Sequence, residues 1–336
     1  MKKVFVSGGS GYIALHCIVQ LIKKNFFVVT SVRNITRSKE IINSVSKIIE
    51  CKNKIKFIEL DLMKDEGWKE AINGCEYVLH IASPVSLKVS DEPDTLIKPA
   101  VEGLKRCLRS AVNNKVKRFV MTSSFSAIGA GSRQKELNDD DWTDLNNPKI
   151  TSYDISKTKA EIYLWNYVEK LKPSESIEIC TINPVIVIGP SLSDDIGISN
   201  IVIRKLLDGS MPLIPKVGLN LIDVKDVAEM HIEAMLHKNA AGKRFLLSSE
   251  SIWISDLAKI LRNNNYSKVS RLIAPNFLIK LLSIFDKEIK IILFYLGFKN
   301  ILHINNAVNI LKYKPRKIKK AVLETAKQLY DLKMIK

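Results

Sequence analysis

Cysteine is scarce in this sequence, and the few cysteines are not spaced as ligands. Five occur among 336 residues, an odd number, and none belongs to a C-x-x-C pair. This spacing argues against a disulfide framework and against a zinc site, so no metal is expected. We predict that most of the five are small buried hydrophobic residues: Cys17, Cys51, Cys75, Cys107 and Cys180.

The sequence also lacks a recognisable leader and any apolar run long enough to span a bilayer. Glycines interrupt the first apolar run, residues 4–6, and no signal-peptide core follows, so a cytoplasmic location is the default expectation. Two apolar clusters in residues 277–298 are short, and Asp286, Lys287 and Glu288 separate them. We expect core helices there and no membrane contact; a substrate-entry or membrane-touching surface is the alternative.

Acidic residues are outnumbered by basic ones, 35 against 52, which gives a formal net charge of +17. Such a charge can attract phosphates, nucleic acid or an anionic membrane. No nucleic-acid-binding motif accompanies it, so we expect a lysine-rich solvated surface and no nucleic-acid partner. The densest basic run, 312–320, leads into a segment whose apolar residues have helical spacing and should pack on the protein itself: Ile318, Val322, Leu329 and Leu332.

The first half of the chain alternates between short β-rich runs and helix-length segments. The β-rich runs are continuously apolar, as strands buried on both faces should be. This alternation predicts an α/β fold, a doubly wound parallel sheet of the Rossmann type with the ligand at the carboxyl ends of the strands. The predicted strands are 4–7, 27–32, 55–59, 77–81, 118–123 and 177–183, and the predicted helices are 12–24, 37–49, 65–73, 95–113 and 153–170.

The pattern changes after Pro190. Glycines and prolines break the rest of the chain into short helices, and one strand-like run, GKRFLLSS (242–249), stands apart. We therefore predict two domains. Residues 1–190 would bind a dinucleotide and carry the catalytic residues, and residues 191–336 would form a smaller mixed α/β substrate lobe. Some segments of the second, such as 219–250, would pack back on the first.

The stretch SGGSGYIA (7–14) joins the first predicted strand to the first predicted helix. A strand, a glycine turn and a helix suit a pyrophosphate, because backbone N–H groups point outward and the helix dipole favours an anion. The glycines fit two spacings. One is G-x-G-x-x-A from Gly9, the usual dinucleotide fingerprint, and the other is G-x-x-G-x-x-A from Gly8, Gly11 and Ala14.

The end of the second predicted strand bears on the choice of nucleotide. Sites that prefer NAD place an Asp or Glu there to bind the ribose 2′-hydroxyl. Here the chain has Arg33 instead, with Arg37 and Lys39 close behind. A guanidinium can pair with a 2′-phosphate, so we predict NADP(H); a solvated surface arginine is the alternative.

Two segments carry the candidate catalytic residues: TSSFSAI (122–128) and TSYDISKTKAE (151–161). Tyr153 and Lys157 are four residues apart, hence on one face of a helix. The ordinary tyrosine pKa of ~10 is too high for a proton carrier at neutral pH, and a lysine ammonium together with an oxidised nicotinamide would lower it. Ser124 could hydrogen-bond the same substrate oxygen. These features together select the G-x-x-G-x-x-A spacing.

Other ionisable residues have simpler interpretations. His80 and His231 have no ligand spacing to another His, Cys or Asp, so we expect packing or capping roles. Asp223 and Asp226 stand at the start of a predicted helix, where a carboxylate caps the N-terminus and complements its dipole.

With these motifs in order, the chain resembles the extended short-chain dehydrogenase/reductases, and within them the dihydroflavonol 4-reductase-like branch, which includes aldehyde and ketone reductases. The likeness covers nearly the whole chain. Its motifs are SGGSGYIA (7–14), TSVRN (30–34), LDL (60–62), GCEYVLHIASP (74–84), IKPAVEGLKRCLRSA (97–111), VKRFVMTSS (116–124), YDISKTKAE (153–161), INPVIVIGP (182–190), DVKDVAEMHIEAM (223–235) and GKRFLLSSESIW (242–253).

The resemblance implies a role for each matching residue. Ser124, Tyr153 and Lys157 match the catalytic triad. The positions that match cofactor contacts are, along the chain, the phosphate turn, the NADP-selecting arginine, the pair beside the adenine, the strand end along the cofactor and the segment beside the nicotinamide: Gly8, Gly11, Tyr12, Ile13; Arg33; Asp61, Leu62; Ala82, Ser83, Pro84; Pro184 and Val187. Tyr153 and Lys157 would also contact the cofactor.

Two positions depart from the family pattern. Ser7 replaces the usual threonine before the first glycine and keeps the hydroxyl. Gly129 stands where plant dihydroflavonol reductases have an asparagine that meets the flavonoid, so a smaller substrate fits better.

The resemblance implies an NADPH-dependent reductase of a small or medium aldehyde or ketone, acting as a monomer or homodimer. The alternatives are a nucleotide-sugar epimerase or dehydratase with tightly bound NAD, a hydroxysteroid dehydrogenase-like enzyme at a membrane, and a redox-sensing regulator that binds NADP without catalysis.

Overall fold

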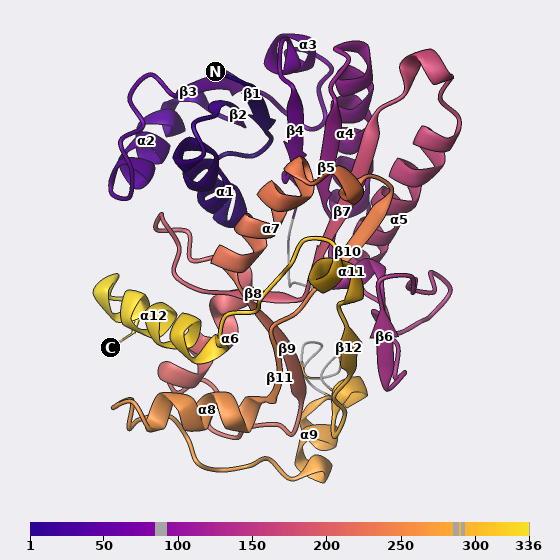
Figure 1. Cartoon of the computed structure of the whole chain (residues 1–336). Helices are drawn as coiled ribbons and strands as arrows, with labels where there is room; N and C mark the ends of the chain where they lie inside the picture. Colours follow the sequence, from indigo (N-terminus) through magenta and orange to yellow (C-terminus); the bar gives the residue numbers. More distant parts are fainter. Residues whose placement is uncertain (85–92, 285–288, 290–292, 336) are drawn as a thin grey trace.

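A parallel sheet of seven strands forms the centre of the structure, a computed structural model that describes residues 1–84, 93–284, 289 and 293–335 (Figure 1). The strand order is β10-β7-β5-β4-β1-β2-β3, and each neighbouring pair is parallel. The strands are β1 (Lys3–Val6), β2 (Phe27–Val32), β3 (Ile55–Glu59), β4 (Tyr77–His80), β5 (Arg118–Thr122), β7 (Glu178–Pro184) and β10 (Lys243–Leu247).

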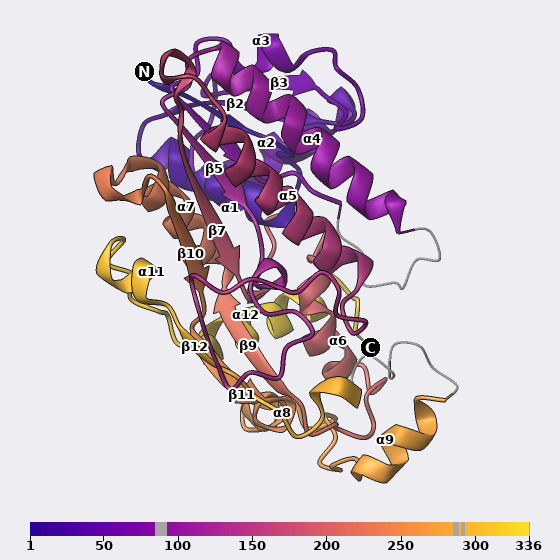
Figure 2. The ribbon, with the colours of Figure 1, turned by 90° about the vertical axis from the view of Figure 1, so that its right-hand side faces the viewer.

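Helices cover both faces of this sheet, which confirms the predicted fold class. Along β1, Val4 and Val6 pack on one side and Phe5 on the other, because successive side chains of a strand alternate. One face is covered by α1 (Tyr12–Lys23), α2 (Ser38–Ser46) and α7 (Val224–Leu236), and the other by α3 (Trp68–Ile72), α4 (Asp94–Asn113) and α5 (Ser152–Glu169). In Figures 1 and 2, α1 lies beside α7 and α4 lies beside α5.

The predicted elements of the first half are confirmed, with shorter helices at two places. The predicted helix 37–49 is a 3-10 turn, η1 (Ile35–Arg37), followed by α2. The predicted helix 65–73 begins only at Trp68. Gly67 precedes it in the left-handed region, at φ +83°, and this conformation stops the helix from extending toward residue 65.

The strand-like run 242–249 packs back on the first domain, where it contributes a strand to the main sheet. Residues 243–247 form β10, which pairs with β7 and is an edge of the main sheet. Before it enters β10, the chain forms α7, which packs against α1. Asp223 caps α7 by accepting from Lys225 N at 2.8 Å, as the sequence predicts.

A second core lies below the main sheet in Figure 1. Its sheet has the order β11-β9-β8, and its helices enclose a separate set of apolar side chains that includes Ile318, Val322 and Leu329, so the predicted packing of the basic tail is confirmed. The elements are β8 (Ile186–Ile188), α6 (Ile201–Leu207), β9 (Gly218–Asp223), β11 (Glu250–Trp253), α8 (Ile254–Arg262) and α12 (Ile318–Asp331).

Short elements connect these layers. Strands β6 (Glu136–Asn138) and β12 (Ile301–His303) pair in parallel, far apart in sequence. The others are η2 (Phe125–Ala127), η3 (Pro173–Glu175), η4 (Ile198–Asn200), η5 (Lys238–Ala240), α9 (Asn276–Leu282) and α11 (Asn305–Asn309). All five cysteines are buried, as predicted.

The expected core helix over the first apolar cluster is wrong. The seven-residue α9 buries Ile279, whereas Phe277 and Ile284 are 72% and 73% exposed. The second core is filled by α6, α8 and α12, so α9 lies on the surface. The second cluster falls partly outside the described residues. No helix in the described part of the chain is both long and apolar enough to cross a membrane.

Two phenylalanines test this assignment of core and surface. Phe245→Ala empties a fully buried site in β10 and should lower the free energy of unfolding by about 3–5 kcal/mol. Phe277→Ala removes an exposed ring and should change it by less than about 0.5 kcal/mol. Urea unfolding followed by circular dichroism measures both. A loss of more than about 2 kcal/mol for Phe277→Ala would contradict the surface position of α9.

Candidate active site

The glycine turn after β1 runs close against two neighbouring strands. Gly8 has φ +70°, and a Cβ placed there would lie 3.0 Å from the Ala82 Cβ. A Cβ on Gly9 would lie only 2.2 Å from Thr30 Oγ1. The Gly8 and Gly9 amides donate to Ser31 Oγ and Ser31 O, each at 2.8 Å. The turn therefore needs glycine for steric reasons as well as for its φ angle.

The N-terminus of α1 follows this turn. Gly11 is the N-cap residue and has no side chain to cap the first-turn N–H groups, which suits an anion. The Tyr12 hydroxyl turns away to donate to Gly189 O at 2.8 Å. The turn thus presents backbone N–H groups, including those of Tyr12 and Ile13, to an anion. The Tyr12 side chain instead joins α1 to the loop after β8.

Ser7 connects the turn to the end of β4. Its Oγ accepts from Ile81 N and Ala82 N, each at 2.9 Å, and lies 3.1 Å from His80 Nδ1. His80 is buried, and burial lowers its pKa to about 3. The serine that replaces the usual threonine therefore fixes the segment that continues to Ser83 and Pro84.

The residues expected around the adenosine lie at the ends of β2 and β3. Arg33 is exposed, and Arg37 Nη1 donates to Ser10 Oγ on the glycine turn at 3.1 Å. Arg37 also donates to Glu40 at 3.1 and 3.2 Å. Asp61 Oδ1 accepts from Met63 N at 2.8 Å, and Leu62 packs beside α4.

The three candidate catalytic residues come together from β5 and α5. Ser124 follows β5 and caps η2, accepting from Ser126 N at 3.1 Å. Thr151 and Asp154 form a capping box at the start of α5, which fixes the first turn that carries Tyr153. The Ser124 hydroxyl neighbours Tyr153 and lowers the pKa of its phenol.

Lys157 lies one turn further along α5 and is buried. Its Nζ donates to Thr122 O at 3.1 Å and lies 6.0 Å from the centre of the Tyr153 ring. Thr122 is held in turn by His231, whose Nε2 lies 2.6 Å from Thr122 Oγ1. The ammonium, the phenol and the serine hydroxyl thus face one region at the end of β5.

For the protein without a cofactor, burial is the largest influence on the pKa values of Tyr153 and Lys157. It raises the pKa of Tyr153 to about 12, and the neighbouring Ser124 hydroxyl opposes that rise. Burial lowers the pKa of Lys157 to about 8, and the Glu161 carboxylate opposes that fall. The pKa of Tyr153 is therefore raised in the protein alone, whereas Lys157 and an oxidised nicotinamide together are expected to lower it. A phenol with a raised pKa stays protonated at neutral pH, which suits a proton donor.

The last two predicted cofactor residues lie at the far side of the same edge. Pro184 ends β7 and pairs with Leu247 of β10, and Val187 is buried in β8. Asn183 and Glu161 also lie here, and neither is predicted from the sequence motifs. For Glu161 there was a signal, because it continues the four-residue spacing of Tyr153 and Lys157.

In the part of the chain that the structure describes, no group of three or more His, Cys, Asp or Glu side chains could hold a metal ion.

Comparisons with known proteins place this arrangement in a family. The family model described as the NAD dependent epimerase/dehydratase family matches residues 4–247. Cinnamoyl-CoA reductase 2 of Arabidopsis thaliana is 31% identical over 265 residues, 77% of this chain and 76% of the relative. Anthocyanidin reductase of Vitis vinifera is 29% identical over 282 residues, 77% of this chain and 80% of that one.

A solved structure extends the likeness to the whole fold. The yeast methylglyoxal/isovaleraldehyde reductase Gre2, complexed with NADPH, superposes with a TM-score of 0.82 at 23% identity, covering 99% of both chains. This likeness shows a common fold that includes the second core. The motif-based resemblance is thereby confirmed, and the chain belongs to the NAD dependent epimerase/dehydratase family.

Proposed function

We propose that this protein is an NADPH-dependent reductase that converts a small or medium aldehyde or ketone into an alcohol. The observation that carries the proposal is the meeting of Ser124, Tyr153 and Lys157 at the end of β5. A half-buried phenol, a neighbouring serine hydroxyl and a buried ammonium form a proton-donating site. The similar curated relatives are reductases, which supports the same chemistry.

The residues around the glycine turn fit a dinucleotide. Ala82 and the turn approach as closely as a glycine permits, and Ser83 Oγ is buried with no hydrogen-bond partner among the described residues. An unpaired buried hydroxyl on this strand end suits a polar ligand. When bound, NADPH supplies the hydride. The residues that would hold it are Gly8, Gly11, Tyr12, Ile13, Arg33, Asp61, Leu62, Ala82, Ser83, Pro84, Tyr153, Lys157, Pro184 and Val187.

The substrate carbonyl would lie between Ser124 and Tyr153. Tyr153 donates its proton to the carbonyl oxygen, and the Ser124 hydroxyl stabilises the negative charge that develops there. A Cβ on Gly129 would lie 2.4 Å from Leu137 Cδ1, so an asparagine does not fit at this position without a shift. A flavonoid contact like that of the plant enzymes is therefore absent, which favours a smaller carbonyl compound.

A screen for NADPH consumption over aldehydes and ketones tests the function, with Tyr153→Phe as the decisive variant. Removing the phenolic hydroxyl should lower kcat by ~10²–10³ and leave NADPH binding intact. Tyr163→Phe is the matched control, because Tyr163 lies on the same helix at the α4 contact. Retention of turnover within about tenfold in Tyr153→Phe would show that another group donates the proton. Stoichiometric NAD(H) in the purified protein would favour the epimerase alternative.

Lys157 should set the alkaline limb of the pH profile. Its pKa is about 8, so the ammonium is present below that pH and is lost as pH rises through it. We expect kcat/KM for the carbonyl to be flat below pH 8 and to fall above it. Lys157→Arg should move this limb to higher pH, because a guanidinium stays protonated. A limb that keeps its position in Lys157→Arg would mean that a different group titrates.

Arg33 and Arg37 should select NADPH over NADH. Arg33→Ser removes a cation that can pair with the 2′-phosphate and should raise KM for NADPH by about 10–100-fold, with KM for NADH little changed. Arg37→Ser should have a similar effect, because Arg37 contacts Ser10 on the turn. Lys39→Ser is the control, since Lys39 is exposed nearby. Equal changes in KM for both nucleotides would contradict recognition of the 2′-phosphate.

A further inference from the structure

A buried carboxylate that the proposed chemistry does not use lies next to the candidate catalytic residues. Glu161 follows Lys157 by one helical turn and Tyr153 by two, and its side chain is fully buried. Burying a carboxylate is costly unless the charge is paired and both oxygens are hydrogen-bonded. The partners of Glu161 therefore indicate what the charge is held there to do.

One carboxylate oxygen binds the segment that carries Ser124. Ser123 Oγ donates to Glu161 Oε2, and Asn183 Nδ2 donates to the same oxygen at 2.7 Å. Asn183 Nδ2 also lies 3.3 Å from Ser124 O. The Glu161 carboxylate is thus connected to Ser124 in two ways: through Ser123, the preceding residue, and through the side-chain amide of Asn183 in β7.

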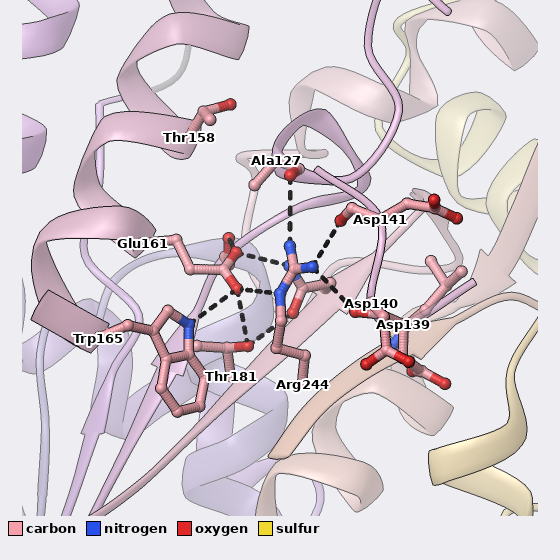
Figure 3. A network of polar contacts seen from close by, with 12 residues as sticks. Ala127, Asp139, Asp140, Asp141, Thr158, Glu161, Trp165, Thr181 and Arg244 are labelled. Atoms are coloured by element: carbon pink, nitrogen blue, oxygen red, sulfur yellow. Dashed lines mark hydrogen bonds and ion pairs between the residues drawn. The ribbon is translucent and has the colours of Figure 1, made fainter. Parts of the chain in front are cut away.

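The other oxygen binds a buried guanidinium. Arg244 Nε donates to Glu161 Oε1 at 2.6 Å, and Trp165 Nε1 donates to it at 3.3 Å (Figure 3). Thr181 Oγ1 lies 3.1 Å away. Arg244 comes from β10, the edge strand of the sheet, so the ion pair joins α5 to an element more than eighty residues later in the chain.

Arg244 in turn holds the chain that follows Ser124, both before and after β6. Its Nη2 donates to Ala127 O at 3.2 Å, and its Nη1 donates to Asp139 O at 2.8 Å and Asp141 O at 2.5 Å (Figure 3). The guanidinium also lies 3.8 Å from the centre of the Trp142 ring, a favourable cation–π contact. Both sides of Ser124 are therefore attached to one ion pair.

We infer that Glu161, paired with Arg244, is a positioning residue that fixes Ser124 relative to Tyr153 and Lys157. This inference rests on the proposed function, because it assigns a role in that reaction. The carboxylate shares a helix face with the phenol and the ammonium and holds the serine segment by direct hydrogen bonds. A displacement of about 1 Å of one reacting group can cost ~10² in rate, so this restraint contributes to turnover.

Glu161 also acts on the charge of Lys157. The titratable groups around Lys157 are Tyr153 and Glu161 on α5, His80 on β4 and His231 on α7. Burial lowers the pKa of His80 to about 3 and that of His231 to about 4, so both are neutral at pH 7. The Glu161 carboxylate raises the pKa of Lys157, against the effect of burial, and so favours the ammonium.

Glu161→Gln tests the inference in the full-length protein with NADPH and the best substrate of the screen. We expect kcat to fall about 10–100-fold, KM for NADPH to change little, and the alkaline limb of the pH profile to move to lower pH. Glu161→Asp keeps the charge and should restore part of kcat and the position of the limb. Thermal unfolding and NADPH binding establish that each variant is folded.

Glu178→Gln is the matched control. Glu178 of β7 pairs with the buried Arg118 of β5 at 2.7 Å, at the end of these two strands that is opposite to Ser124 and Asn183. It should lower thermal stability without changing kcat or the pH profile. Should Glu161→Gln fail to fold, Ser123→Ala removes one of the same hydrogen bonds at no cost in charge, and a fall in kcat of about 3–10-fold is expected.

The outcomes separate the two proposals. An active wild-type protein whose folded Glu161→Gln or Ser123→Ala variant keeps both kcat and the pH profile would overturn the positioning role and leave the proposed function standing. A wild-type protein that reduces no carbonyl compound with NADPH would overturn the proposed function itself.

Discussion

Parallel pairing of the central strands is the constraint on which the rest of the structure depends. In a parallel sheet, every strand presents its carboxyl end at the same edge. The glycine turn after β1, the arginines after β2, Ser83 after β4 and Ser124 after β5 therefore converge without any sequence proximity. The chain needs helices on both faces to make this pairing possible. Those helices supply the apolar side chains that cover the two faces of the main sheet, and one of them, α5, carries Tyr153 and Lys157.

Burial of charge is the physical cost of this arrangement. Lys157 and Glu161 both lie within the protein, and each charge is compensated by specific protein partners. Arg244 binds one oxygen of the Glu161 carboxylate, and Ser123 and Asn183 bind the other, which makes its burial tolerable. A buried ion pair is weak evidence for stability, and its geometry here is better explained by the order that it imposes on the serine segment.

The second core has a different physical character. It lies beneath the main sheet and has its own apolar cluster, yet the chain returns from it to supply α7 and β10 to the first core. The first core therefore cannot be completed by the first half of the chain alone. This interleaving also brings Arg244 to Glu161, so an ion pair near the candidate catalytic residues depends on the late return of the chain.

Much of the fold and of the candidate site could be predicted from local signals. Hydrophobic runs and glycine positions located the strands of the first half, and the four-residue spacing placed Tyr153 and Lys157 on one helix face. Local signals failed where packing decides. The apolar cluster around Phe277 has the composition of a core helix, and it is on the surface because the available core was filled by other helices.

The sequence by itself determined the order of elements, the glycine turn and the set of candidate reactive groups, because each depends on a few neighbouring residues. Only the tertiary structure decided that β10 joins the main sheet, that Arg37 reaches the turn, and that Glu161 holds both Arg244 and the serine segment. These contacts join distant parts of the chain, and no local pattern encodes which buried charge will meet which. The same holds for the protonation of Tyr153, because its pKa follows from burial that the finished fold creates.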